Sequence, residues 1–204
     1  MTLRLIIIGA GGHAISVTNV ALSCGYSVIA YVDDNKKGKS IFDIPILSTE
    51  VCYNSYKNHN YFVAIGRNAV REKIVNELKM TLPNAKFPSL IHQSSVIGVG
   101  SKLDEGTVVM PQVNIGPNSN VGSFCIINTS SSIDHESCVK DFASLSPGVI
   151  TGGNVNIGLK AAISIGTTIK QGISIGDNTI IGASSYVNKN IEEHVVAYGI
   201  PCRT

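Results

Sequence analysis

The chain has 204 residues, of which 44% are hydrophobic and 15% charged, enough for one large domain or two small ones with their own cores. Its formal net charge is only +2 and no basic run is interleaved with aromatic residues, which excludes nucleic acid as a partner. The one early apolar run is too short to span a membrane and lacks the features of a signal peptide, so we expect a cytoplasmic protein without a membrane partner.

Residues 1–88 alternate strand-like and helix-like patterns. The strand-like runs are residues 3–10, 26–34 and 61–66, and the helix-like runs are residues 13–25 and 67–80. One helical stripe in the last run is formed by Val70, Ile74, Val75 and Leu78. This order predicts a Rossmann-like α/β domain over residues 1–88, with a parallel sheet covered by helices.

A glycine-rich loop, GAGGHA at residues 9–14, follows the first strand and opens the first helix. It fits the pattern G-x-G-x-x-A, with Asp33 and Asp34 about twenty residues later, as in dinucleotide sites. Because the domain offers too few strands for two mononucleotide-binding halves, a nucleotide-sugar fits better than a dinucleotide. The structural alternative is a tight turn for the glycines and a strand-ending turn for the aspartates.

The second half, residues 89–204, follows a period of six. Aliphatic side chains occupy fifteen of sixteen positions spaced six apart, and a small or β-branched residue stands two positions before each. The sixteen positions are Ile97, Leu103, Val109, Ile115, Val121, Ile127, Ile133, Val139, Leu145, Thr151, Ile157, Ile163, Ile169, Ile175, Ile181 and Val187. Hexapeptide repeats predict an all-β parallel β-helix with three strands in each coil, in which the aliphatic residues stack inside.

An acid-flanked histidine stands out in this repeat, in the segment Asp134, His135 and Glu136. His135 comes two positions after the inward Ile133, which places it at or near a corner with its side chain outward. Acyl transfer from a thioester needs a base, and a carboxylate beside an imidazole can fix its tautomer and stabilise the imidazolium. On these residues alone, an exposed histidine in a polar turn is the simpler interpretation.

Over nearly its whole length the chain resembles the hexapeptide-repeat sugar acetyltransferases of bacteria that carry a small Rossmann-like N-terminal domain, the PglD/NeuD type. The matching segments are IIIGAGGHA, YVDDN, FVAIGRNAVREKI, LIHQSSVIG, IINTSSSIDHESCV and VVAYGIPCRT, with Cys202 where the family usually has alanine. The resemblance implies a homotrimer of left-handed β-helices, acetyl-CoA as the acetyl donor, and an active site between neighbouring subunits.

The resemblance also implies roles for particular residues. It makes His135 the general base and Glu136 the acid that raises its basicity. It places the acceptor sugar at Gly11, Gly12, His13, Asp33, Asp34 and Gly66, and acetyl-CoA at Ser144, Ile165 and Ala183. Asn128 lies in a matching segment and is expected either to hydrogen-bond substrate or to form an asparagine ladder in a β-helix turn. Some members have a second histidine at the position of Ser144, whose hydroxyl can donate a hydrogen bond but cannot carry charge.

Together these features predict an acetyl-CoA-dependent N-acetyltransferase that acts on a UDP-linked 4-amino-4,6-dideoxy sugar in bacterial surface glycan biosynthesis. O-acetylation of a sialic or related nonulosonic acid is the enzymatic alternative, and a nucleotide-sugar-binding scaffold is the non-enzymatic one. No metal is expected, because His92 and His194, the other histidines of the second half, lie near the domain junction and the tail. Five cysteines without a CxxC pair predict free thiols.

Overall fold

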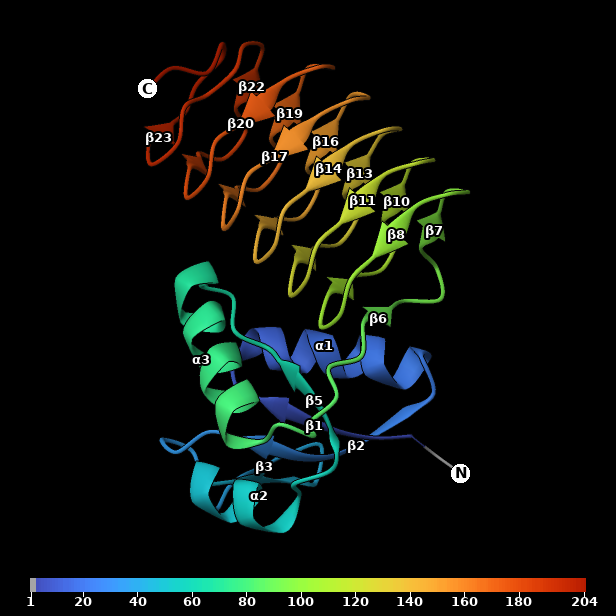
Figure 1. The fold of residues 1–204 in the computed structure, drawn as a ribbon, viewed down its shortest axis with the longest axis vertical. Helices are drawn as coiled ribbons and strands as arrows, with labels where there is room; N and C mark the ends of the chain where they lie inside the picture. The colour runs from blue at the N-terminus through green and yellow to red at the C-terminus, as the bar shows by residue number, and fades with distance from the viewer. Residues whose placement is uncertain (1–2) are drawn as a thin grey trace.

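In the computed structural model, which describes residues 3–204, an open sheet with three helices is followed by a tall coil of two-residue strands (Figure 1). The predicted fold class, a Rossmann-like α/β region followed by a left-handed parallel β-helix, is confirmed. No helix within residues 3–204 is long and apolar enough to cross a bilayer. All five cysteines are free thiols.

The N-terminal sheet has five strands in the order β3-β4-β2-β1-β5. Its strands are β1 (Leu3–Ile8), β2 (Tyr26–Val32), β3 (Ser40–Ile41), β4 (Ile44–Leu47) and β5 (Asn60–Val63). The helices are α1 (Gly12–Ser23), α2 (Thr49–Ser55) and α3 (Asn68–Thr81). The four longer strands are parallel, as predicted, whereas β3 pairs antiparallel with β4 in a hairpin that the sequence patterns did not indicate.

Strand β1 is apolar on both faces because helices cover both sides of the sheet. Leu5 and Ile7 pack in one cluster with residues of α1, while Ile6 and Ile8 pack in another with residues of α2 and α3. This explains why the run LRLIII shows no alternation of polar and apolar residues. The carboxyl ends of β1, β2 and β5 therefore meet at one edge of the sheet, beside the N-termini of α1 and α3.

Helix α3 departs from the predicted apolar stripe in one respect. Val75 and Leu78 are buried, but Val70 is 36% exposed. The buried residue of the first turns is instead Arg71, which is 1% exposed. A guanidinium thus occupies the place where the stripe predicted an aliphatic side chain.

The β-helix has three faces, each a parallel sheet in which a strand pairs with the equivalent strand of the next coil, as in Asn120↔Cys138. The seven-stranded face contains β6 (Leu90–Ile91), β9 (Val108–Val109), β12 (Ile126–Ile127), β15 (Ser144–Leu145), β18 (Ala162–Ile163), β21 (Ile180–Ile181) and β23 (Val196–Ala197). The six-stranded face contains β7 (Val96–Ile97), β10 (Asn114–Ile115), β13 (Ser132–Ile133), β16 (Ile150–Thr151), β19 (Thr168–Ile169) and β22 (Tyr186–Val187). The five-stranded face contains β8 (Lys102–Leu103), β11 (Asn120–Val121), β14 (Cys138–Val139), β17 (Asn156–Ile157) and β20 (Ser174–Ile175).

Three corners join these faces. We call residues 128–131 and the equivalent residues of the other coils the first corner, which leads from the seven-stranded to the six-stranded face. Residues 134–137 and their equivalents form the second corner, between the six- and five-stranded faces, and residues 140–143 and their equivalents form the third. Most corners include one residue in the left-handed region, such as Ser130, Glu136 and Phe142, with φ of 57°, 55° and 57°.

The core of the coil follows the six-residue period. The second residue of nearly every strand points inward and is buried, and its copies stack from coil to coil. Buried hydroxyls two positions earlier donate to carbonyls of the next coil; Thr107 donates to Gly122 O at 2.7 Å and Ser119 to Asp134 O at 3.0 Å. The small residues therefore satisfy the backbone at the corners as well as filling space.

The N-terminal part covers the lower half of the seven-stranded face (Figure 1). Leu90, Val108 and Ile126 point outward from that face and are buried in the cluster that includes α1. Higher on the same face Ser144 is half-buried, and Ile180 is 46% exposed. The outward surface of β15, β18 and β21 is therefore not covered by the N-terminal part, and we call this surface the shelf.

Candidate active site

His135 lies at the second corner with its side chain 55% exposed. Its Nδ1 is 3.2 Å from Oε2 of Glu136, while Oδ1 of Asp134 accepts the backbone N–H of His135 at 2.8 Å. The two acids thus have different roles, because Asp134 shapes the turn and Glu136 alone reaches the imidazole. With Nδ1 on the carboxylate, Nε2 is the ring nitrogen available to a substrate.

The ring of His135 packs against Gly153, which lies one coil further along the second corner. A β-carbon at Gly153 would lie 2.5 Å from Cε1 of His135, closer than any real contact. The backbone holds both residues together, since the N–H of Asn154 donates to His135 O at 2.8 Å. Gly153 was not singled out by sequence reasoning, although its place three hexapeptides after the histidine could have indicated it.

The residues expected to hold acetyl-CoA lie on or next to the first corner. Ile165 and Ala183 are exposed there, one coil apart, and the N–H of Ser184 donates to Ile165 O at 2.9 Å. Ser144 points outward from β15, on the adjoining seven-stranded face where the cover by the N-terminal part ends. These three residues therefore border the uncovered shelf.

Asn128 lies at the first corner too, below Ile165. Its Oδ1 accepts the N–H of Thr129 at 2.8 Å, which leaves its amide nitrogen for another partner. The stacked positions one coil away are Met110 and Ser146, so no asparagine ladder forms. This favours the ligand-binding interpretation of Asn128 over the structural one.

The chain does not bring His135 to the residues of the first corner. The first and second corners are opposite edges of the six-stranded face, so the imidazole and the shelf lie on different sides of the prism. Only a second chain can present a second corner to the first corner of this one.

A cleft of about 380 Å³ opens at the carboxyl ends of β1, β2 and β5 and is lined by Gly9, Asp33, Asp34, Tyr53 and Ile65, among others. Asp34 accepts hydrogen bonds from the N–H of Thr49 at 2.9 Å and from its hydroxyl at 2.7 Å. These bonds to Thr49 lower the pKa of Asp34. Within residues 3–204, the carboxylate of Asp33 accepts only the N–H of Asn35, at 3.1 Å. Of the two aspartates, Asp33 has the more available carboxylate.

Of the four glycines in this region, only one is required by the local backbone conformation and packing. Gly9 has a φ of 101°, and a β-carbon there would meet the carbonyl of Ala64 at 3.1 Å, so the turn itself needs glycine. Gly11, Gly12 and Gly66 have no left-handed φ, and open space surrounds the position of a β-carbon. Neither packing nor conformation requires glycine at these three positions, which favours close approach of a ligand.

His13 lies in the first turn of α1, and its buried Nε2 has no hydrogen-bond partner among the residues that the structure describes. Burial lowers the pKa of His13 to about 4, and the positive charge of Arg71 lowers it further. The imidazole is therefore neutral at physiological pH. A buried ring nitrogen without a partner is costly, so it is a natural contact for a polar ligand.

Two cations of the site were missed by sequence reasoning. Lys36 donates from Nζ to the carbonyl of Ala10 at 2.7 Å and so lies directly over the glycine-rich loop. The signal for it was the lysine pair that follows the predicted aspartates. Arg71 is buried between α3 and the third corner, and no local pattern marks it as different from the exposed arginines.

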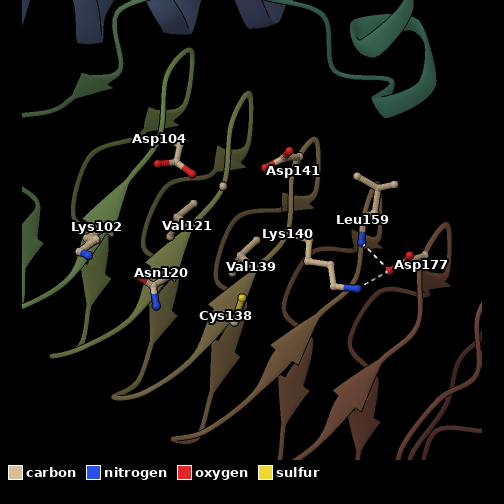
Figure 2. Close-up of a pocket in the computed structure, with 11 residues that line it drawn as sticks. Lys102, Asp104, Asn120, Val121, Cys138, Val139, Lys140, Asp141, Leu159 and Asp177 are labelled. Atoms are coloured by element: carbon tan, nitrogen blue, oxygen red, sulfur yellow. Dashed lines mark hydrogen bonds and ion pairs between the residues drawn. The ribbon is translucent and has the colours of Figure 1, made fainter.

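The largest grooves of the single chain lie elsewhere. One of about 540 Å³ runs over the five-stranded face, and Figure 2 shows Lys102, Asn120 and Cys138 pointing into it from successive coils. Asp177 closes one end, accepting from Leu159 N at 2.8 Å and from Lys140 Nζ at 3.2 Å. None of the predicted site residues lines this groove. Within residues 3–204, no group of three or more His, Cys, Asp or Glu side chains could hold a metal ion.

Comparisons with known proteins bear on the whole chain. A family model described as the PglD N-terminal domain matches residues 4–78. The chain is 28% identical over 174 residues to GDP-perosamine N-acetyltransferase of Escherichia coli O157:H7, which covers 82% of this chain and 78% of the relative.

Solved structures match over almost the full length. One is a histidine-to-alanine variant of GDP-perosamine N-acetyltransferase from Caulobacter crescentus in complex with CoA and GDP-perosamine, at 30% identity and a TM-score of 0.93, covering 98% of this chain and 95% of that one. Another is the acetyltransferase domain of PglB from Neisseria gonorrhoeae FA1090 in complex with acetyl coenzyme A, at 28% identity and a TM-score of 0.93, covering 100% and 99%. The similarity thus includes both the sheet and the coil.

Proposed function

Because the chain belongs to the hexapeptide-repeat sugar acetyltransferases of the PglD type, we propose that it acetylates the amino group of a nucleotide-linked 4-amino-4,6-dideoxy sugar for bacterial surface glycan synthesis. The family establishes the reaction class, an acetyl-CoA-dependent sugar N-acetyltransferase. The observation that carries the mechanism is the geometry of His135, whose Nδ1 faces Glu136 and whose Nε2 faces away from that carboxylate.

His135 acts as the general base of the proposed reaction. The sugar amine attacks the thioester carbonyl carbon, and Nε2 of His135 accepts the proton that the nitrogen loses. The carbon–sulfur bond then breaks, and the imidazolium returns the proton to the leaving thiolate. Glu136 accepts the Nδ1–H and stabilises the imidazolium. A well-placed general base accelerates such a reaction by ~10²–10⁴-fold, and we expect Glu136 to contribute to this acceleration.

We place this site between two chains of a homotrimer. The six-stranded face exposes Val96, Ile150 and Tyr186 at 60%, 51% and 38%, separated by the outward residues Asn114, Ser132 and Thr168, and another chain can cover these apolar groups. If three such faces close around a threefold axis, the second corner of one chain meets the first corner of the next. His135 of one chain then faces Ser144, Ile165 and Ala183 of its neighbour.

The nucleotide-sugar is proposed to bind in the cleft at the carboxyl ends of β1, β2 and β5. Asp33 and Asp34 line this cleft and offer polar contacts, whereas Gly11, Gly12, His13 and Gly66 lie outside its lining, on the adjoining loops and the first turn of α1, where the glycines would allow close approach of the ligand. Lys36 supplies a positive charge over the loop for the pyrophosphate. Lys36→Met is therefore expected to raise the KM for the nucleotide-sugar about tenfold and leave that for acetyl-CoA unchanged, in steady-state kinetics with each substrate varied.

The proposed substrate class is tested by incubating the protein with acetyl-CoA and a panel of UDP- and GDP-linked 4-amino sugars and free sialic acids. Release of free thiol reports turnover, and His135→Ala serves as the matched inactive variant. The sequence predicts the UDP-linked sugar, whereas the Caulobacter crescentus relative is in complex with GDP-perosamine and the Escherichia coli relative is named for it, and the panel separates the two sugar classes. Turnover on sialic acids alone, or an unchanged rate in His135→Ala, would contradict the proposal.

A further inference from the structure

Arg71 is the largest fully buried side chain of the described chain, at 1% exposed. A buried guanidinium usually pairs with a carboxylate, but within residues 3–204 none lies within ion-pair distance of Arg71. Its partners are neutral oxygens. Burial lowers the pKa of Arg71 to about 10, so the group remains charged at physiological pH. A charge retained at this cost without a counterion calls for an explanation beyond packing.

The hydrogen bonds of Arg71 divide between the two parts of the molecule. On one side, Nη1 donates to the carbonyls of Ile65 at 2.8 Å and Gly66 at 3.2 Å, in the loop between β5 and α3. On the other side, Nε donates to Phe124 O at 2.8 Å and Nη2 to Phe142 O at 2.7 Å. The last two carbonyls belong to successive coils at the third corner.

Neighbouring contacts extend this join to a third coil. Asn68 accepts from Nη2 of Arg71 at 3.0 Å and donates to the carbonyls of Lys160 and Ala161 at 3.0 and 3.1 Å. The rings of Phe124 and Phe142, whose carbonyls accept from Arg71, stack with centroids 5.3 Å apart. The first turns of α3 are thus fastened to three successive coils through backbone oxygens.

Both ends of Arg71 lie next to the proposed substrate positions. Gly66 belongs to the loop proposed to receive the nucleotide-sugar, and the charge of Arg71 reaches His13 in the same region. Phe142 comes two residues before Ser144, which borders the shelf proposed for acetyl-CoA. One planar group therefore joins the loop proposed for the nucleotide-sugar to the corner from which the strand of Ser144 begins.

We propose that Arg71 is a positioning residue that fixes the nucleotide-sugar loop relative to the acetyl-CoA shelf, so that the sugar amine meets the thioester. This inference rests on the proposed function. A guanidinium suits the role because its rigid fork donates in several fixed directions at once, which the single ammonium of a lysine cannot do. Each substrate binds mainly to its own part, so loss of the fork disturbs their mutual placement more than the binding of either.

The test compares Arg71→Lys with Lys79→Met as the matched control. Lys79 also lies on α3 and also joins the two parts, through Glu105 at 2.6 Å, but it contacts neither the loop nor the coil carbonyls. We expect kcat to fall about tenfold to a hundredfold in Arg71→Lys, with both KM values changed less than about threefold, since a shift of about 1 Å can cost that much. Lys79→Met should retain kcat. A folded Arg71→Lys variant with wild-type kcat would overturn the proposal.

If Arg71→Lys does not fold, Asn68→Ala should lower kcat several-fold at unchanged KM, and wild-type kcat there would equally overturn the proposal. Hydrogen exchange needs no turnover: the amides that flank the loop, at Ala64, which donates to Ile8 O, and at residue 71, which donates to Arg67 O, should exchange at least about tenfold faster in Arg71→Lys than in Lys79→Met. Equal exchange would count against Arg71 itself, whereas a wild-type protein inactive on every nucleotide-sugar would count against the proposed function.

Discussion

The orientation of His135 depends on the absence of a side chain at Gly153. The imidazole occupies the space where a β-carbon would stand, while Glu136 holds its Nδ1 from the other side. A general base must lie within hydrogen-bond reach of the proton it takes, so a turned ring loses most of its value. The geometry proposed for catalysis at this corner is therefore shared by two successive coils.

Gly153→Ala is expected to displace the ring and to lower kcat about tenfold to a hundredfold, with little change in stability. Gln171→Ala, one coil further along the same corner and exposed, is the matched control and should retain the wild-type rate. Steady-state kinetics with both variants measures the difference. A Gly153→Ala variant as active as the wild type would show that the orientation of the His135 ring does not depend on the free space at residue 153.

His13 predicts a pH dependence of stability. Its pKa is about 4 in the folded chain and near the ordinary 6.5 when unfolded, so between these values the unfolded state binds more protons. Stability contributed by this group is thus complete above pH 6.5 and is lost as pH falls toward 4. Between pH 7 and pH 4.5 the wild type should lose about 2–3 kcal/mol more than His13→Gln, measured by urea unfolding. Equal losses in the two proteins would mean that His13 is protonated without penalty.

At the scale of elements, the β-helix is held together by its buried hydroxyls as well as by its aliphatic stacks. Thr107 is 0% exposed, donates to Gly122 O at 2.7 Å and accepts from Cys125 N at 3.0 Å. Removing the hydroxyl leaves a buried donor and a buried acceptor without partners.

Thr107→Val, which keeps the shape of the side chain, should therefore destabilise the protein by about 2 kcal/mol. Ser174 points outward from β20 on the five-stranded face and is exposed, so Ser174→Ala should change stability by less than about 0.5 kcal/mol. The midpoints of chemical unfolding compare the two. Similar midpoints would show that the hydroxyl bonds add nothing to the coil.

The elements also differ in how well their residues predict them. The coil is predictable because a period of six repeats one local environment. The positions of Ile115, Ile133 and their copies therefore predict both where each strand lies and how it pairs with the next coil. The hairpin of β3 and β4 has no such repetition. Helix α3 was predicted, but the burial of Arg71 in place of Val70 was not, because it depends on the carbonyls of Phe124 and Phe142, which belong to the other part of the molecule.

The site residues could likewise be located in part from their spacing in the sequence. His135 could be located at a corner from its distance to Ile133, and Asp33 and Asp34 from their distance to the glycine-rich loop. What the residues could not indicate is which corners face one another. That depends on how separate chains pack against one another, which a single repeat does not encode.

In the whole molecule, the residues with proposed roles in base catalysis and in acetyl-CoA binding lie at different corners of the coil. His135 lies on the second corner, whereas Ile165 and Ala183 lie on the first, with the six-stranded face between them. Apolar side chains on that face, such as Val96 and Ile150, are available for burial by another chain. A shared site follows from this arrangement if the imidazole is to reach an acetyl group at all.

Co-expression of two inactive variants tests this most directly. His135→Ala removes the base, and Ala183→Trp blocks the shelf, so each homo-oligomer should be inactive. In a randomly mixed closed ring, sites formed by the intact corner of each variant should restore about a quarter of the wild-type rate. No recovery in purified mixed oligomers would contradict a site built from two chains and place base and donor on one.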